Sequence, residues 1–183
     1  VATSTAMLAY LNNASSKASP ANENYARELF ELHGLGSQAY LHALYDRWRE
    51  VPGATEGKAK GYIDEDVYEA ARAFTGWSYE MGQYVAEGVT LPRTGNFTYI
   101  EHWHDPYQKR VLGVEFDSHM GPMMDGRNVL DLVAFHPATA RHVCLRLCKR
   151  FVSDAPSTDL VNGATDVFIT HSRAQDQLAK VLT

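Results

Sequence analysis

The chain has few cysteines, and their spacing excludes common uses of cysteine. Only two of its 183 residues are cysteine, Cys144 and Cys148, and they lie four positions apart on an expected helix. A disulfide at that spacing would be strained, and two thiolates do not complete a zinc site. We therefore expect two buried free thiols, which leave the redox compartment open.

Long apolar runs and an excess of basic residues are also missing. No stretch is long and apolar enough to cross a bilayer, so no membrane span is expected. The formal charge of −5 argues against a general nucleic-acid-binding protein. The first eleven residues lack the basic start and apolar core of a signal peptide, and the chain does not begin with methionine.

The motifs that define common enzyme classes are absent from the sequence. There is no Gly-x-Ser-x-Gly elbow, no glycine-rich phosphate-binding loop and no His-Glu-x-x-His motif. The chemistry that stays open is hydrolysis by carboxylates, or hydrolysis assisted by a metal.

What is present is a globular composition with a mostly helical pattern. With 45% hydrophobic and 21% charged residues, residues 1–183 are expected to form one helical domain. The patterns predict a mainly α fold, a multi-helix orthogonal bundle with a small β-hairpin. Helices are expected at 6–11, 22–33, 37–50, 64–74, 125–135, 139–152, 158–170 and 173–182. The hairpin strands are expected at 96–100 and 110–116, with 102–106 in a long turn between them.

The densest group of ionisable residues lies between Asn22 and Gly36, within about four helical turns. Asn22 is expected to cap the helix and Gly34 to end it in a left-handed conformation. Helical spacing places Arg27, Glu31, Asn24 and Glu28 opposite an apolar face.

This polar face has two interpretations. On one, it is a solvated surface with pairs of Arg27 with Glu31 and Asn24 with Glu28. On the other, Glu28 and Glu31 point into a groove, where desolvation drives their pKa values apart and one acts as acid, the other as base.

A second candidate site is the run from His102 to Asp105. Two histidines spaced i,i+2 on an extended segment, His102 and His104, would face the same side. Together with Asp105 they could hold a divalent metal, although the favoured expectation is that the protein needs no cofactor. The alternative is that Asp105 or His104 caps a turn or pairs with Arg72 or Lys109.

Other residues are candidates for binding or for structure. Arg72 is expected either to form a buried ion pair with Glu28 or Glu31 or to clamp a substrate. His136, directly before Pro137, is expected to cap a helix at a junction. Aromatic side chains that would line a sugar-stacking groove, or pack in the core, are Trp77, Trp103, Tyr79, Tyr99 and Tyr107.

Several ordered blocks of sequence are similar to those of a known family. They are residues 6–11, 22–36, 66–77, 104–105 with 109 and 111–113, 125–131, and 136–141 running on to 150–152. In these blocks the chain resembles the C-terminal half of a bacterial family catalogued as domain of unknown function 1800. Members are usually longer and many look exported, so the resemblance implies an exported bacterial protein that lacks an N-terminal portion. The chain departs from the pattern at Asn12, usually Asp, and at Tyr107, often Gly, and His102 lies outside the pattern.

Two functions follow as expectations. The first is a hydrolase on a polysaccharide or cell-envelope polymer, in which Glu28 is the general acid, Glu31 or Asp105 its partner, and His104 orients the site. Its substrate-binding residues are expected to be Asn24, Arg72, Trp77 and Trp103. The alternative is a non-catalytic helical module that binds a surface polymer or partner protein, with the same residues in buried structural ion pairs. An apolar face left by the missing portion would favour self-association.

Overall fold

The computed structural model describes residues 2–44 and 46–183, and in this range the chain is mainly helical. The helices are α1 (Thr5–Tyr10), α2 (Asn24–Glu28), α3 (Asp64–Ala73), α4 (Met124–Ala134), α5 (Pro137–Phe151), α6 (Thr158–Thr170) and α7 (Gln177–Leu182). Three antiparallel two-stranded sheets lie between α3 and α4, formed by β1 (Trp77–Tyr79) with β4 (Phe97–Tyr99), β2 (Tyr84–Ala86) with β3 (Val89–Thr90), and β5 (Lys109–Val111) with β6 (Val114–Phe116). The prediction of a mainly helical fold with a small antiparallel sheet is confirmed.

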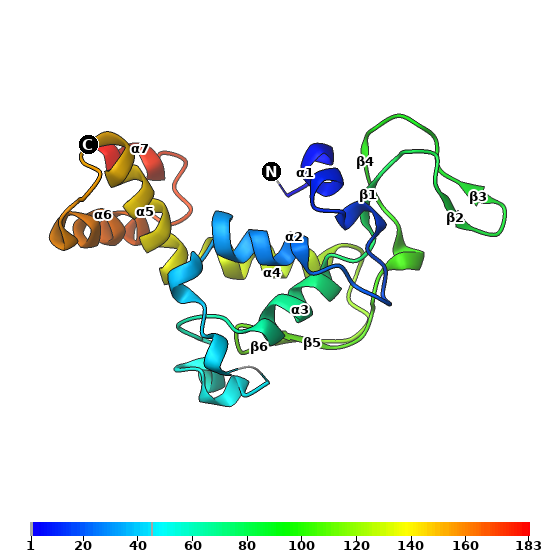
Figure 1. Cartoon of the computed structure of the whole chain (residues 1–183), viewed down its shortest axis with the longest axis horizontal. Coiled ribbons are helices and arrows are strands. Elements are labelled where there is room, and N and C mark those ends of the chain that lie inside the picture. Colours follow the sequence, from blue (N-terminus) through cyan, green and yellow to red (C-terminus); the bar gives the residue numbers. More distant parts are fainter. Residues whose placement is uncertain (1, 45) are drawn as a thin grey trace.

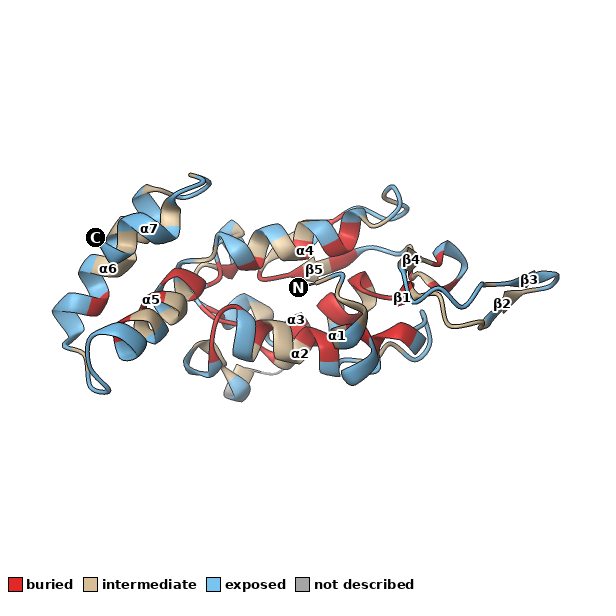
Figure 2. Cartoon of the chain, turned by 90° about the horizontal axis from the view of Figure 1, so that it is seen from above, coloured by how far each residue is buried: buried red, intermediate tan, exposed pale blue. Residues whose placement is uncertain are grey.

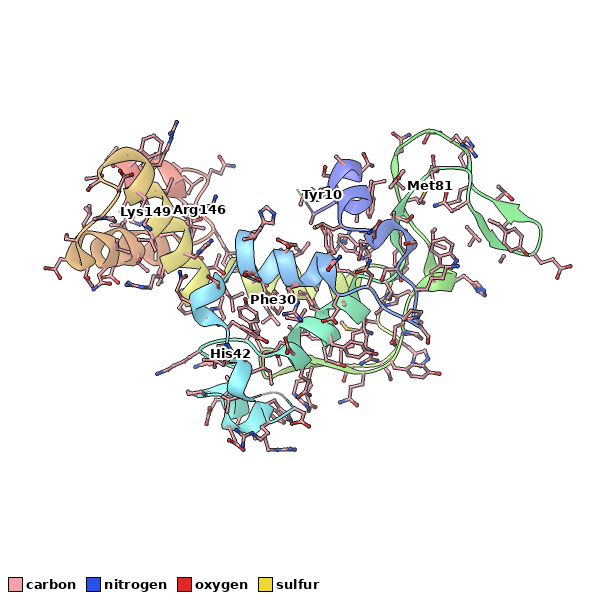
Figure 3. The ribbon with its side chains drawn as sticks, viewed as in Figure 1. Tyr10, Phe30, His42, Met81, Arg146 and Lys149 are labelled. Atoms are coloured by element: carbon pink, nitrogen blue, oxygen red, sulfur yellow. The ribbon has the colours of Figure 1, made fainter. Side chains whose placement is uncertain are left out.

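The molecule is elongated around a central group of helices. Helices α2, α3 and α4 lie at the centre, the β2–β3 hairpin projects at one end, and α5, α6 and α7 form a lobe at the other (Figure 1). Buried residues concentrate in the central part, whereas the hairpin and the lobe are largely exposed (Figure 2). Phe30 projects from the segment after α2 into this centre (Figure 3), where it packs edge-on against Tyr62. No helix in the described ranges is long and apolar enough to cross a membrane.

Helix α3 runs through this centre because one of its faces carries small apolar side chains. Val67, Ala70 and Ala71 are fully buried, which lets α2 and β5 approach closely. Phe74, directly after the helix, packs edge-on against Tyr25 and Trp77. A Cβ on Gly126 would lie 2.6 Å from Cζ2 of Trp77, so glycine at the start of α4 lets that helix rest on the indole.

The start of α3 is capped by the side chain of Asp66, in the first turn of the helix. One oxygen of Asp66 accepts the backbone N–H of Ile63 at 3.0 Å, and the other accepts that of Leu112 at 2.7 Å. Asp64 instead accepts hydrogen bonds from Arg27 and from the Tyr40 hydroxyl. Asp66 therefore ties the start of α3 to the turn of the β5–β6 hairpin. Burial raises the pKa of Asp66 to about 6, despite both hydrogen bonds, which lower it.

We expect the raised pKa of Asp66 to shape the pH dependence of stability. Because the folded state holds the Asp66 proton more tightly than the unfolded state, this group adds stability below about pH 4, which is lost as the pH rises through about 6. Asp66→Asn removes the titration together with one acceptor. The destabilisation caused by the substitution should therefore be largest near pH 4 and shrink toward pH 7, as measured by urea unfolding of both proteins. A loss that stays constant or grows over this range would contradict the assignment.

The prediction of a helix over 37–50 is wrong. The chain forms three short 3₁₀ turns there, Ser37–Ala39, His42–Leu44 and Trp48–Glu50, while Tyr45 lies outside the described residues. The backbone bonds across the chain instead of along a helix, because Leu41 N–H donates to Tyr62 O and Tyr62 N–H to Ala39 O. The aromatic residues of this segment lacked a helical period strong enough to decide the outcome.

The prediction that 96–100 and 110–116 pair in a single hairpin is also wrong. Strand β4 pairs with β1, whereas β5 pairs with β6 through a two-residue turn at Leu112 and Gly113. Both turn residues have positive φ, 53° and 79°, which is the geometry of a type I′ hairpin turn. A Cβ on Gly113 would overlap the Ala54 carbonyl group, so this position also allows a close backbone approach.

The helix that begins near Asn22 is shorter and less regular than expected. The N-cap residue of α2 is Glu23 and not the predicted Asn22, although the Asn22 side chain does accept the Asn24 N–H at 3.0 Å. After Glu28 the chain continues as one π-helical turn, Leu29–His33, and Gly34 has φ −116° instead of the predicted left-handed conformation. Glycine is required at position 34 for another reason, since a Cβ there would overlap the Val133 side chain.

Candidate functional site

The two glutamates predicted as an acid pair do not join the other site residues. Glu28 ends α2 and Glu31 lies in the following π-helical turn, and both are half-buried. Neither side chain forms a hydrogen bond or ion pair with another residue in the described part of the chain. The predicted pair of Arg27 with Glu31 is wrong, because Arg27 bonds Glu23 and Asp64. Asn24 is exposed beside them.

Arg72 and Asp105 form the first half of a buried ion network. Arg72 Nε lies 2.7 Å from one oxygen of Asp105 and Nη2 lies 3.1 Å from the other, a two-point contact. Arg72 Nη1 also donates to both oxygens of Glu69, at 2.8 Å each. Burial alone raises the pKa of Asp105, but the hydrogen bonds from Arg72 and from the Tyr107 N–H outweigh it and lower that pKa. The predicted pairing of Asp105 with Arg72 is confirmed, and that of Arg72 with Glu28 or Glu31 is wrong.

Lys109 and Asp125 form the second half. The Lys109 side chain is fully buried, and its Nζ donates to Asp125 Oδ2 at 2.6 Å and to the carbonyls of Asp105 and Tyr107 at 2.6 and 2.7 Å. Burial opposes the ionised form of Asp125, but hydrogen bonds from His104 and Lys109 lower its pKa. The other oxygen of Asp125 is buried and has no hydrogen-bond partner among the described residues.

His104 joins this network through both ring nitrogens. Nε2 lies 3.2 Å from Asp125 Oδ2, and Nδ1 lies 3.0 Å from the Thr75 carbonyl and 3.2 Å from its hydroxyl oxygen. The Thr75 hydroxyl already donates to the Arg72 carbonyl and accepts the Asp105 N–H, so it faces His104 as an acceptor. Both ring nitrogens of His104 are therefore engaged within the protein, and neither is open to a ligand.

We call the six side chains Glu69, Arg72, His104, Asp105, Lys109 and Asp125 the ion network. It joins the end of α3, the segment before β5 and the start of α4. Its ionised side chains are paired with one another and largely buried, which is the geometry of a structural connection between elements.

The proposed metal ligands do not converge. His102 is exposed in the 3₁₀ turn Glu101–Trp103, where the sequence predicted an extended segment, while His104 and Asp105 bond within the ion network. Across residues 2–44 and 46–183, no three or more His, Cys, Asp or Glu side chains are placed to hold a metal ion.

The predicted stacking tryptophans lie in the core. Trp77 is almost completely buried and packs edge-on against Phe74 and Phe97. Trp103 is buried beneath the Lys17 ammonium, 4.1 Å from the ring centroid. Their predicted role in substrate binding, like the catalytic roles of Glu28, Glu31, His104 and Asp105, stays a prediction.

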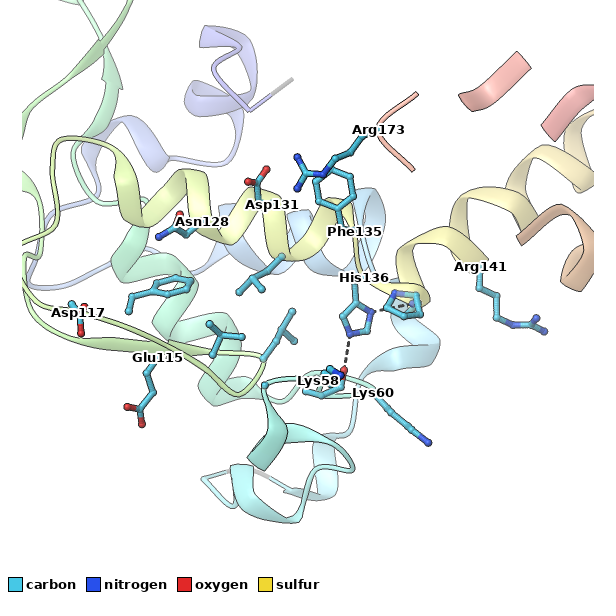
Figure 4. Close-up of a pocket in the computed structure, with 18 of the residues that line it drawn as sticks. Lys58, Lys60, Glu115, Asp117, Asn128, Asp131, Phe135, His136, Arg141 and Arg173 are labelled. Carbon is cyan, nitrogen blue, oxygen red and sulfur yellow. Dashed lines mark hydrogen bonds between the residues drawn. The ribbon is translucent and has the colours of Figure 1, made fainter. Parts of the chain in front are cut away.

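A large hollow lies elsewhere, and sequence reasoning missed it. A groove of about 1040 Å³ opens between the β5–β6 hairpin, α4, the start of α5 and residues 57–60 (Figure 4). We call it the apolar groove, because its floor consists mostly of apolar side chains: Leu112, Val114, Phe116, Met120, Leu132, Phe135, Pro137 and Ala138. The alternation of Val114 and Phe116 along β6 carries a signal for the groove, but the sequence predicts pairing of this segment with 96–100, whereas β6 pairs with β5.

His136 stands where α4 meets α5 and lines this groove. Its Nδ1 accepts the Ala138 N–H at 3.0 Å, which confirms the predicted cap, and its Nε2 donates to the Ala59 carbonyl at 2.7 Å. Burial lowers the pKa of His136, although the hydrogen bond to Ala59 opposes this. His136 is thus a neutral link between the helix junction and the 57–60 segment.

A smaller, more polar pocket of about 580 Å³ lies beside the ion network. Its lining includes His104, His102, His119, Tyr99 and Glu101. His104 contributes its ring but no free nitrogen, because both are bonded inward.

The fold and the site define a mainly helical domain with a buried ion network behind an open apolar groove. The chain belongs to the family described as protein of unknown function DUF1800, whose model matches residues 1–183. A comparison with curated proteins and one with solved structures each found no match.

Proposed function

We propose that this domain is a non-catalytic binding module whose ligand lies in the apolar groove. The observation that carries the proposal is the groove itself, a hollow of about 1040 Å³ with an apolar floor and charged side chains around it. Apolar concavities of this size with a few polar groups are typical of ligand sites. Large contiguous apolar patches are rare on the surface of soluble proteins, and where they occur they mark interaction sites.

The ion network supports this proposal through the elements that it joins. Lys109 begins β5 and Asp125 lies in the first turn of α4, so their contact fixes the hairpin against the helix. The hairpin and α4 are the two long walls of the groove. We infer that the polar residues singled out by the sequence shape the binding surface and do not touch the ligand.

A groove-filling substitution tests the proposal with a neutral apolar dye. Nile red should bind to the wild-type protein with increased emission, and Ala138→Trp, which fills the groove, should weaken binding by about tenfold. Ala9→Trp, on the exposed side of α1, is the matched control and should bind dye like the wild type.

Two outcomes would contradict the proposal. One is dye binding that Ala138→Trp leaves unchanged, since the groove would then not be the site. The other is turnover of a dye-labelled polysaccharide or peptidoglycan by the wild type that is lost in Glu28→Gln, since the expected hydrolase would then explain the protein better.

A further inference from the structure

The charges around the apolar groove are unevenly distributed. Lys58, Lys60, Arg141 and Arg173 surround the end where His136 and Phe135 lie (Figure 4). Arg141 bonds the Asn162 amide oxygen, and Arg173 stacks 3.8 Å from the Phe135 ring centroid. For none of the four does a described carboxylate oxygen lie within 4.0 Å, which leaves their charges available to a ligand.

We call these four residues the cationic end, and it stands out because the whole chain carries a formal charge of −5. The acidic residues Glu115 and Asp117 lie at the other end of the groove, and Asp131 lies on α4 between the ends (Figure 4). A ligand with one anionic group would therefore be oriented, with that group at the cationic end.

We propose that the apolar groove binds a free single-chain anionic amphiphile, with its carboxylate or phosphate head at the cationic end and its alkyl chain along the floor. This inference rests on the proposed function, since it names the ligand of the same groove. An alkyl chain suits the floor because the apolar side chains there offer no hydrogen bonds that a more polar ligand would need.

The head is held by exposed cations and not by His136. Both nitrogens of His136 are bonded to the backbone, so it offers no hydrogen bond to the head. Lys58, Lys60, Arg141 and Arg173 are all exposed. Binding of the head should therefore weaken as salt is added, while binding of the alkyl chain should not.

Three amphiphiles with the same alkyl chain and different heads test the proposal. Displacement of Nile red is measured with dodecanoate, dodecanol and dodecyltrimethylammonium, each below its aggregation limit. Dodecanoate should bind about tenfold more tightly than dodecanol, and the ammonium should bind most weakly. This order is demanding, because the alcohol is the more hydrophobic molecule and would bind best by apolar contact alone.

Charge reversal at the cationic end provides the matching variants. Lys58→Glu with Lys60→Glu should weaken dodecanoate binding by about tenfold and leave dodecanol binding unchanged within about twofold. Lys149→Glu with Arg150→Glu reverses the same number of exposed charges on α5, outside the groove lining, and should have no effect. Figure 3 shows Lys149 on the lobe of α5, α6 and α7. Because all four positions are exposed, these variants are expected to fold.

The outcomes separate this inference from the proposed function. Equal affinity for the three heads, or Nile red binding without displacement by dodecanoate, would overturn the inference while the groove remained a binding site. If the wild-type groove does not bind Nile red either, both the inference and the proposed function are overturned.

Two further outcomes would assign the groove to another occupant. Binding to anionic phospholipid vesicles without binding to dodecanoate would assign the cationic end to a membrane. A ligand-free dimer in sedimentation that Ala138→Trp dissociates would assign the groove to a second copy, and either result overturns the inference.

Discussion

Lys109→Met should lower the free energy of unfolding by about 3–5 kcal/mol, the usual cost of breaking a buried ion pair. The Lys109 ammonium is completely enclosed and lies 2.6 Å from Asp125. Methionine fills a similar volume but removes the ammonium that bonds the Asp125 carboxylate and two backbone carbonyls, so that Asp125 keeps only its contact with His104. For a chain of this length the melting temperature should fall by roughly 6–20 °C, measured by circular dichroism.

Two further variants give this prediction its controls. Lys180→Met, in α7, breaks an exposed pair with Asp176 just before the helix and should change stability by less than about 0.5 kcal/mol. Asp125→Asn, combined with Lys109→Met, should recover part of the loss, because the unpaired buried charge is removed. If Lys109→Met melted within a degree or two of the wild type, the ion network would not hold the hairpin to α4 as described.

Arg72→Gln should be the second most damaging substitution, at about 3 kcal/mol. Removing the guanidinium leaves Asp105 and Glu69 facing each other across a space from which water is largely excluded. Glutamine supplies one uncharged amide nitrogen, whereas the guanidinium contacts Asp105 through Nε and Nη2 and both oxygens of Glu69 through Nη1. Urea unfolding at neutral pH measures the loss.

Arg27 is the matched control for Arg72, since it also bridges two carboxylates, Glu23 and Asp64. The two sites differ in exposure: the Arg27 side chain is 34% exposed and that of Arg72 is 15% exposed. Arg27→Gln should therefore cost no more than about 1 kcal/mol. Similar losses in the two variants would show that burial does not set the strength of these bridges.

Local patterns predicted most of the helices and some of the contacts. The helices from residue 64 onward were placed to within a few residues, except that α7 begins later, because their apolar spacing is regular and their caps are recognisable. The buried thiols of Cys144 and Cys148 and the cap by His136 were also predicted. These features depend on residues that are close along the chain, and such local relations can be read from the sequence itself.

The features that were missed depend on distant neighbours. Asp125 lies 16 residues from Lys109 and 21 from His104, so no local spacing pointed to it as a partner. Glu69 was within reach of a local argument, since it lies three positions before Arg72 on one helix. The apolar groove combines β5–β6, α4, α5 and residues 57–60, and its shape follows from packing that single-sequence periodicity does not encode.

The lobe of α5, α6 and α7 has a thermodynamic consequence for the groove. The lobe packs mainly within itself, and α6 buries only Val161. The side chains of His142 and Arg146 form hydrogen bonds with the Leu32 carbonyl in the central part of the molecule. Such a unit opens by local unfolding at a lower free energy than the core, so its amides should exchange with solvent first. Because Arg141 and Arg173 belong to the lobe, each opening of the lobe removes two of the four cations from the groove. The stability of the lobe, and not that of the core, therefore limits how long the cationic end stays intact.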